Sequence, residues 1–120
     1  MMNIQEFYAS IDPAGKEYEE VMSRLGTERL VSKYLKKMAD DKSFANLKEA
    51  IASENYKDAF MASHTIKGIC MNLSLKLLAD SSSALTEELR DNPDPAQVQA
   101  LFKQVEEDYR IVTDGIRSIE

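Results

Sequence analysis

Apolar residues recur along this chain at intervals of three and four, the spacing that places them on one face of an α-helix. The expected helices cover about 3–10, 16–25, 27–52, 56–73, 75–90 and 95–119. No stretch alternates apolar and polar residues as a half-buried strand does. This order predicts an all-α protein, a single domain over 1–120. It would be an antiparallel up-down four-helix bundle over about 27–119, with the short N-terminal helices of about 3–25 capping it.

Local signals fix several helix ends. Asn55, followed by Asp58, is a typical N-cap for a helix over about 56–73, and Asp94 before a proline begins the last helix. The first long segment is different, because small and acidic residues interrupt it at 39–43 and the apolar positions resume at Phe44 out of register. We therefore expect a break or kink in that segment.

The helix over 56–73 carries His64, the only histidine of the chain. At about 100° per residue, one set of side chains lies opposite His64 and forms the expected buried stripe. That set is Asn55, Ala59, Ala62, Ile66, Ile69 and Leu73. A second set surrounds His64 at offsets of three, four and seven. It consists of Lys57, Phe60, Met61, Lys67, Gly68 and Met71. His64 should therefore face water.

A lone histidine on a helix is often only a solvated polar residue or a satisfied core residue. Its neighbours favour a functional site. Gly68 costs a helix about 1 kcal/mol relative to alanine and lies one turn beyond the ring, where it opens access. Lys67 can bring an ammonium to an anion on the ring. Lys57 and Lys76 would extend a basic patch, although scattered solubilising lysines are the alternative interpretation.

The run His64-Thr65-Ile66-Lys67-Gly68, followed by Asn72-Leu73, Leu75 and Leu78, resembles the HxxKG signature of histidine-containing phosphotransfer (HPt) domains. These domains are the phosphocarriers of multistep two-component phosphorelays. The resemblance is clear from Asp58 to Leu89 and looser over most of the chain. Many members have glycine where this sequence has Ser74, and Ser63 replaces a common alanine.

The resemblance implies the same bundle and a phosphorelay role without autonomous catalysis. His64 would accept a phosphoryl group from a receiver-domain aspartate and pass it to another receiver. Lys67 would neutralise phosphate charge and Gly68 would provide clearance. The implied partners are response-regulator receiver domains and a hybrid sensor histidine kinase. The chain would need no cofactor, since Mg²⁺ belongs to the acidic pocket of the receiver.

Exposed apolar side chains beside a reactive group suggest a docking patch of Phe60, Met61 and Met71, flanked by Lys57 and Lys76. Alternatively, the N-terminal segment or the first bundle helix covers Phe60 and Met61. A helical adaptor or a degenerate HPt-like module that binds receivers without carrying phosphate is the second functional hypothesis. An enzyme with His64 as general base lacks a second catalytic group.

Composition and charge further narrow the classes of function that this chain could have. The 120 residues carry a net charge of -6, which argues against nucleic acid as a partner. No run approaches the roughly 18 apolar residues of a membrane span, and the start lacks a signal region, so we expect a cytoplasmic protein. Cys70 has no second thiol to pair with and should pack at the edge of the core. No histidine or cysteine stands at ligand spacing from the acidic clusters, so we expect no metal site. One bundle accounts for all the apolar stripes, so we also expect a monomer.

Overall fold

A computed structural model describes residues 1–119 and confirms an all-α protein. The helices are α1 (Ile4–Ile11), α2 (Lys16–Leu25), α3 (Glu28–Ala39), α4 (Ser43–Ala52), α5 (Tyr56–Asn72), α6 (Lys76–Arg90) and α7 (Pro95–Arg117). The predicted ends agree with these bounds to within two residues, apart from the division of the first long segment. None of the helices in the described part of the chain is long and apolar enough to cross a membrane.

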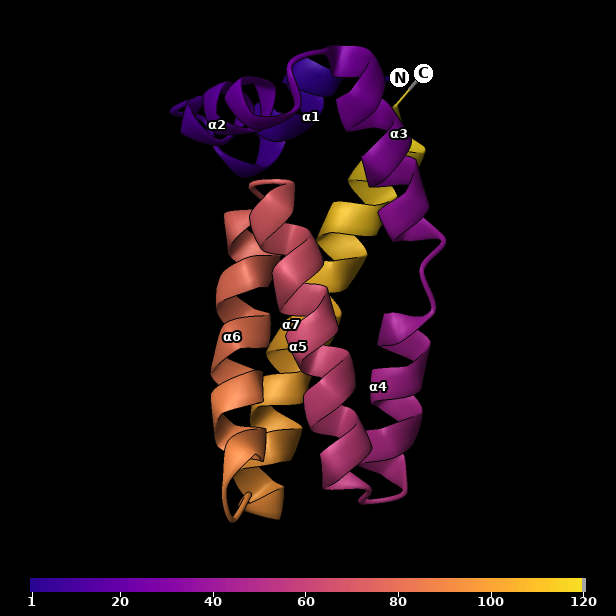
Figure 1. The fold of residues 1–120 in the computed structure, drawn as a ribbon, viewed down its shortest axis with the longest axis vertical. Coiled ribbons are helices and arrows are strands. Elements are labelled where there is room, and N and C mark those ends of the chain that lie inside the picture. The colour runs from indigo at the N-terminus through magenta and orange to yellow at the C-terminus, as the bar shows by residue number, and fades with distance from the viewer. Residues whose placement is uncertain (120) are drawn as a thin grey trace.

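The helices α4, α5, α6 and α7 run up and down beside one another, with α5 between α4 and α6 in the view of Figure 1 and α7 behind it. The helices α1 and α2 lie across one end of this bundle and form a lid, as the sequence predicts. The helix α3 stands above α4 and packs beside the upper part of α7. The helices α5, α6 and α7 therefore run along the long axis of the bundle.

The predicted break in the first long segment is confirmed between α3 and α4, where Asp40 to Lys42 leave the helical path. The apolar residues of α3 do not all share one buried face. Val31, Leu35 and Met38 are buried, but Leu30 and Tyr34 point outward and are exposed. Because of the break, α3 and α4 do not form one continuous helix, and α3 packs mainly against the lid and α7.

Side chains of the lid bind the turn that joins α5 to α6. The Tyr8 hydroxyl donates to the Leu73 carbonyl at 2.6 Å, and a carboxylate oxygen of buried Glu17 accepts the backbone N–H of Lys76 at 3.0 Å. Arg24 Nη1 donates to the Met71 carbonyl at 3.0 Å. These contacts satisfy backbone groups that a helix end leaves without an intrahelical partner. The lid therefore fixes the end of the histidine-bearing helix.

Ser74 occupies this turn with φ +55°, a left-handed conformation that glycine adopts most easily. A side chain there costs about 1–2 kcal/mol. Arg24 offsets part of the cost, since its Nη1 also donates to Ser74 Oγ and to the Asn72 carbonyl, each at 2.9 Å. The serine is thus accommodated where the family commonly has glycine.

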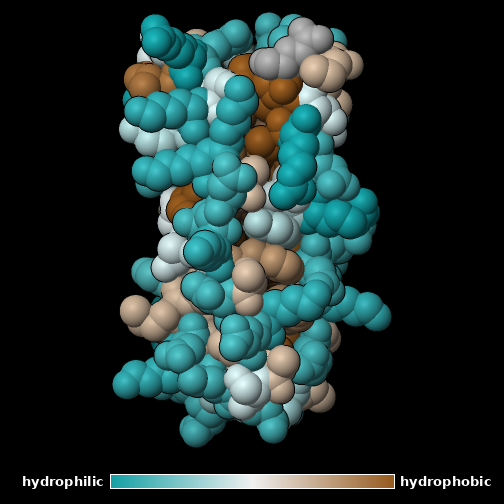
Figure 2. All heavy atoms as spheres, turned by 90° about the vertical axis from the view of Figure 1, so that its right-hand side faces the viewer, coloured by the Kyte–Doolittle hydropathy of each residue, from teal (hydrophilic) through white to brown (hydrophobic). Residues whose placement is uncertain are grey.

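The core is continuous from the lid through the bundle. Phe44 of α4 stacks on Tyr109 of α7, with ring centroids 4.0 Å apart, which closes the core near the break. Cys70 is fully buried rather than at the edge of the core, and burial raises the pKa of its thiol to about 12. The side of the molecule that carries α3 and α4 is mainly hydrophilic, with a strip of apolar atoms in its upper half (Figure 2).

Met2 and Ile119, which lie near the two ends of the chain, are side by side next to the lid (Figure 1). Met2 and Ile119 form an isolated parallel bridge, and the Met2 N–H donates to the Ser118 carbonyl at 2.8 Å. This contact joins the first residues before α1 to the last ones after α7.

Candidate functional site

The helix α5 begins as the sequence predicts. The Asn55 side chain accepts the backbone N–H of Asp58 at 3.2 Å, and its amide donates to the Asp58 carboxylate at 2.8 Å. This N-cap role leaves Asn55 exposed, so its place in the predicted buried stripe is wrong. A capping side chain must reach back to the helix end and cannot also turn into the core.

The buried face of α5 is rotated by about 40° from the predicted stripe, as measured at 100° per residue. Its centre consists of Ala59, Ser63, Ile66, Cys70 and Leu73, all buried. Ala62 and Ile69 are only partly buried. The rotation turns Ser63 toward α6, because α6 packs closely along this side of α5. His64, which directly follows the buried Ser63, is nevertheless exposed.

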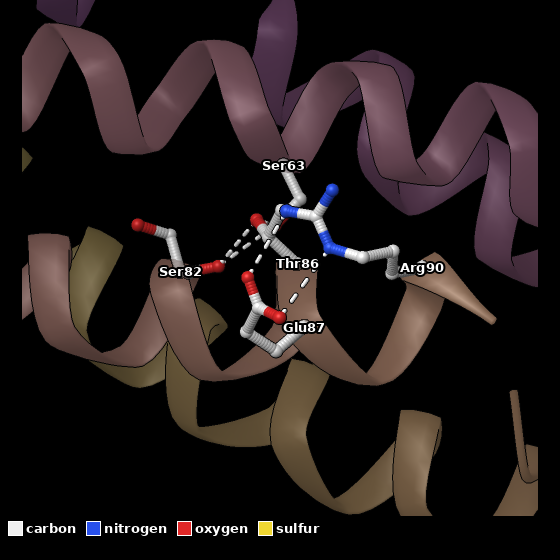
Figure 3. Close-up of polar contacts among 5 residues, drawn as sticks. All are labelled: Ser63, Ser82, Thr86, Glu87 and Arg90. Atoms are coloured by element: carbon white, nitrogen blue, oxygen red, sulfur yellow. Dashed lines mark hydrogen bonds and ion pairs between the residues drawn. The ribbon is translucent and has the colours of Figure 1, made fainter.

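A small hydroxyl network joins α5 to α6 under His64 (Figure 3). Ser63 Oγ lies 2.8 Å from Thr86 Oγ1 and 3.1 Å from the Ser82 carbonyl oxygen, and its single proton can serve either acceptor. Thr86 Oγ1 donates to the same carbonyl at 2.7 Å. All three residues are buried, and Ser82 approaches the histidine helix closely. Such a satisfied network fixes how the two helices lie against each other.

Phe60 lies one helical turn before His64, and its ring is nearly parallel to the imidazole. The ring centroids are 6.0 Å apart and the interplanar angle is 8°. Phe60 is partly buried, and the side chain above it is Arg90 of α6, whose guanidinium carbon lies 5.1 Å from the ring centroid. The alternative that the N-terminal segment or the first bundle helix covers Phe60 is therefore not what the structure shows. Met61, the other residue of that alternative, is exposed.

Arg90 is a site neighbour that sequence reasoning missed. It stands 26 positions after His64 in the sequence, and only the antiparallel pairing of α5 with α6 brings it close. Glu87 holds it through two bonds, Nη2 to Oε1 at 3.0 Å and Nε to Oε2 at 3.4 Å. Arg90 lowers the pKa of the Glu87 carboxyl, with a smaller contribution from Lys67. Lys67 itself is partly buried on α5.

Gly68 is exposed on the same side of α5. A Cβ built on it would meet no heavy atom within 4 Å, apart from its immediate helix surroundings. No packing contact therefore requires a glycine at this position. The space over this step of the helix is open to another molecule.

The predicted contact residues spread along α5. Met61 is 61% exposed and Met71 is 56% exposed, and they lie on either side of His64 along the helix axis. Lys57 is exposed near the start of α5. Lys76 is placed differently, because it stands at the lid end of the bundle, where its ammonium pairs with Asp80 at 3.0 Å.

His64 does not lie in a cavity. A groove of about 510 Å³ opens farther along α5, between this helix, α2 and α3, and Ile69, Tyr34 and Leu25 are among the residues that line it. Within residues 1–119, no group of three or more histidine, cysteine, aspartate or glutamate side chains could hold a metal ion. The site is an exposed imidazole on a convex wall.

Comparison with known proteins gives one family. The family model described as "Hpt domain" matches residues 29–113, which is most of the chain and includes His64. No curated protein and no solved structure gives a match. The chain therefore belongs to the Hpt domain family and takes part in two-component phosphorelays, where such domains carry phosphoryl groups and interact with receiver domains and histidine kinases.

Proposed function

We propose that His64 is the phosphorylated residue, and that the chain accepts a phosphoryl group from a receiver-domain aspartate and passes it to another receiver. The observation that carries this proposal is the exposure of the single histidine beside a lysine and an open glycine step. A partner can reach the imidazole without moving any element of the bundle.

In the proposed step, the lone pair of an imidazole nitrogen attacks the phosphorus of the aspartyl phosphate. A nitrogen–phosphorus bond forms, the bond from phosphorus to the aspartate oxygen breaks, and the aspartate leaves as a carboxylate. Transfer to the next receiver reverses these roles. Phosphoryl transfer mainly demands in-line positioning and neutralisation of the equatorial oxygens. Lys67 is the cation on this chain that we assign to the neutralisation.

The remaining chemistry belongs to the partner. His64 is exposed, and the described residues offer no cluster of three or more acidic, histidine or cysteine side chains for a metal ion. We infer that the receiver supplies the reacting aspartate and the acidic pocket that holds Mg²⁺. The chain acts as a carrier, and catalysis of each transfer is assembled only in the complex.

We infer that the receiver docks over the exposed apolar side chains on either side of His64. Met61 and Met71 are the main candidates, since methionine adapts to more than one surface and a carrier must meet several partners. Lys57 would add charge at the start of α5. Lys76 remains a proposed contact only at the lid end, because its ammonium is already paired with Asp80.

A transfer experiment tests the proposal. The protein is mixed with a receiver that carries labelled aspartyl phosphate, and the label on the protein is followed in acid and in base. The carrier function predicts acid-labile, base-stable label in the wild type and none in His64→Gln. Label that persists in His64→Gln would place the phosphorylated residue elsewhere.

The same experiment addresses the second hypothesis. If the receiver binds to the wild type but no label is transferred, the chain is an adaptor or a degenerate module. Titration calorimetry with the unphosphorylated receiver measures the binding that this comparison needs.

We also expect a monomer with a single domain, because one copy covers its own apolar stripes. Light scattering at increasing concentration tests this expectation. Hpt domains typically act in the cytoplasm, and we expect the same location for this chain.

A further inference from the structure

The geometry points to Phe60 and Arg90 as positioning residues that fix the plane of the His64 ring. Phe60 then orients the imidazole more than it binds the receiver. The consequence for phosphotransfer rests on the proposed function, but the ring orientation itself is a property of the free protein.

The first observation is the stacking of the two rings. An exposed histidine on a helix rotates freely about its terminal torsion, which has a broad energy profile. Phe60, four residues earlier, lies nearly parallel to the imidazole at a centroid distance of 6.0 Å, within the range of favourable offset stacking. Contact with a flat neighbour favours one ring plane and so restricts rotation about this torsion.

The second observation is that Phe60 is itself held. The Arg90 guanidinium lies 5.1 Å from the Phe60 centroid, a cation–π distance, and comes from the neighbouring helix. Glu87 fixes Arg90 through its Nε and Nη2 atoms, so the guanidinium has a defined direction (Figure 3). The sequence of contacts is Glu87 to Arg90, Arg90 to Phe60, and Phe60 to His64.

The third observation is that the distance between the two helices is fixed at the same level. Ser63, next to His64, meets Thr86, next to Glu87, at 2.8 Å between hydroxyl oxygens. Both residues are buried, and both hydroxyl oxygens lie within hydrogen-bond distance of the Ser82 carbonyl oxygen. Arg90 is the last residue of α6 and Phe60 lies in the second turn of α5, so this network fixes the two helices about one turn away from the contact between Arg90 and Phe60.

Orientation matters because a reactive nitrogen must lie in line with the bond that breaks. Groups held in an attacking geometry react far faster than groups that must first find it. A free imidazole would present its nitrogen edge only part of the time. A stacked imidazole presents that edge whenever a receiver docks.

Four substitutions at two positions test the role from both sides of the contact. Phe60→Leu removes the flat face at similar bulk, while Phe60→Tyr keeps it. Arg90→Met removes the cation without touching the core, and Arg90→Lys restores a cation. The control is Arg110→Met, because Arg110 forms the same i,i+3 pair with Glu107 on α7.

The first measurement needs no partner. Nuclear relaxation of the His64 ring in the free protein should show increased motion in Phe60→Leu and Arg90→Met, and unchanged motion in Phe60→Tyr and Arg110→Met. An equally ordered ring in all of these variants would overturn the inference.

The second measurement is single-turnover transfer from a phosphorylated receiver over a range of receiver concentrations. Phe60→Leu should lower the rate at saturation about two- to tenfold, the value of one aromatic pair. Arg90→Met should lower it about two- to fivefold, and Arg90→Lys should recover part of the loss. The half-saturating receiver concentration should change less than about twofold. A change confined to that concentration would make Phe60 a docking residue and contradict the inference.

Failure of the two proposals can be told apart. If the wild type accepts no label, the phosphocarrier proposal is wrong, and the relaxation measurement still decides whether Phe60 and Arg90 order the ring. If label transfers normally but the ring is mobile in the wild type, only the positioning role is wrong.

Discussion

Two helical glycines of this chain should respond to substitution in opposite ways. Gly68 lies in α5 beside the proposed site, and Gly115 lies in the last turns of α7. A Cβ at Gly68 would meet open space. A Cβ at Gly115 would lie 2.7 Å and 2.8 Å from two ring carbons of Phe7, which is fully buried.

The expected magnitudes follow from these contacts. Gly68→Ala should stabilise the fold by about 0.5–1 kcal/mol, since alanine is the better helix former and nothing opposes it. Gly115→Ala gains the same helix propensity, but the new methyl group forces the Phe7 ring out of a packed core, which costs about 1–3 kcal/mol. For a chain of this size, each kcal/mol shifts the melting temperature by about 3–6 °C.

The rate of phosphoryl transfer should not change in parallel with the stability of these variants. Gly68→Gln keeps a good helix former, so the protein should melt at or above the wild-type temperature. Its side chain occupies the step over which a receiver must approach, and transfer to His64 should slow by about 10- to 100-fold. Gly115→Ala should lower the melting temperature and leave the transfer rate of the folded protein within about twofold.

Urea unfolding and single-turnover transfer with a phosphorylated receiver measure the two quantities on the same samples. The reasoning would be refuted by Gly68→Gln with a wild-type transfer rate. It would also fail if Gly68→Ala destabilised the protein, because the glycine would then serve the fold and not the access to His64.

Three further predictions concern the supports of the site. Arg24→Ala should lower the free energy of unfolding by about 1–2 kcal/mol, because it removes charge-assisted hydrogen bonds at the end of α5. Chemical unfolding measures the loss, and a change of less than about 0.3 kcal/mol would contradict the prediction. Ser63→Ala and Thr86→Val should each cost about 1 kcal/mol and be non-additive in a double-mutant cycle, whereas additive losses would show that the two hydroxyls do not interact. Burial raises the pKa of Glu17 above 4.5, so the folded state binds its proton more tightly than the unfolded chain. Its contribution to stability should fall as the pH rises from 4.5 through that raised pKa, and Glu17→Gln should flatten this part of the pH profile of the urea midpoint.

Sequence reasoning succeeded where the signal was local. Apolar spacing and capping residues such as Asn55 and Asp94 act within one turn of the chain, and they placed the helices correctly. It failed where the outcome depends on a neighbouring helix. Tyr34 is exposed because α3 packs mainly against the lid and α7, and Ser63 is buried because α6 packs closely along α5.

The candidate site divides in the same way. His64, Lys67 and Gly68 form a short motif, so their grouping could be predicted from spacing alone. Arg90 could not be found in that manner, because its position over Phe60 depends on the register between two antiparallel helices. The assignment of roles to all four residues remains a prediction that the transfer experiments test.

The bridge between Met2 and Ile119 has a practical consequence. Dyes attached near the two ends would almost touch in the native protein, whereas a denatured chain of this size has a radius of gyration of about 35 Å. Energy transfer between such dyes would therefore report unfolding directly, and labels placed there would sit beside the lid rather than next to the imidazole.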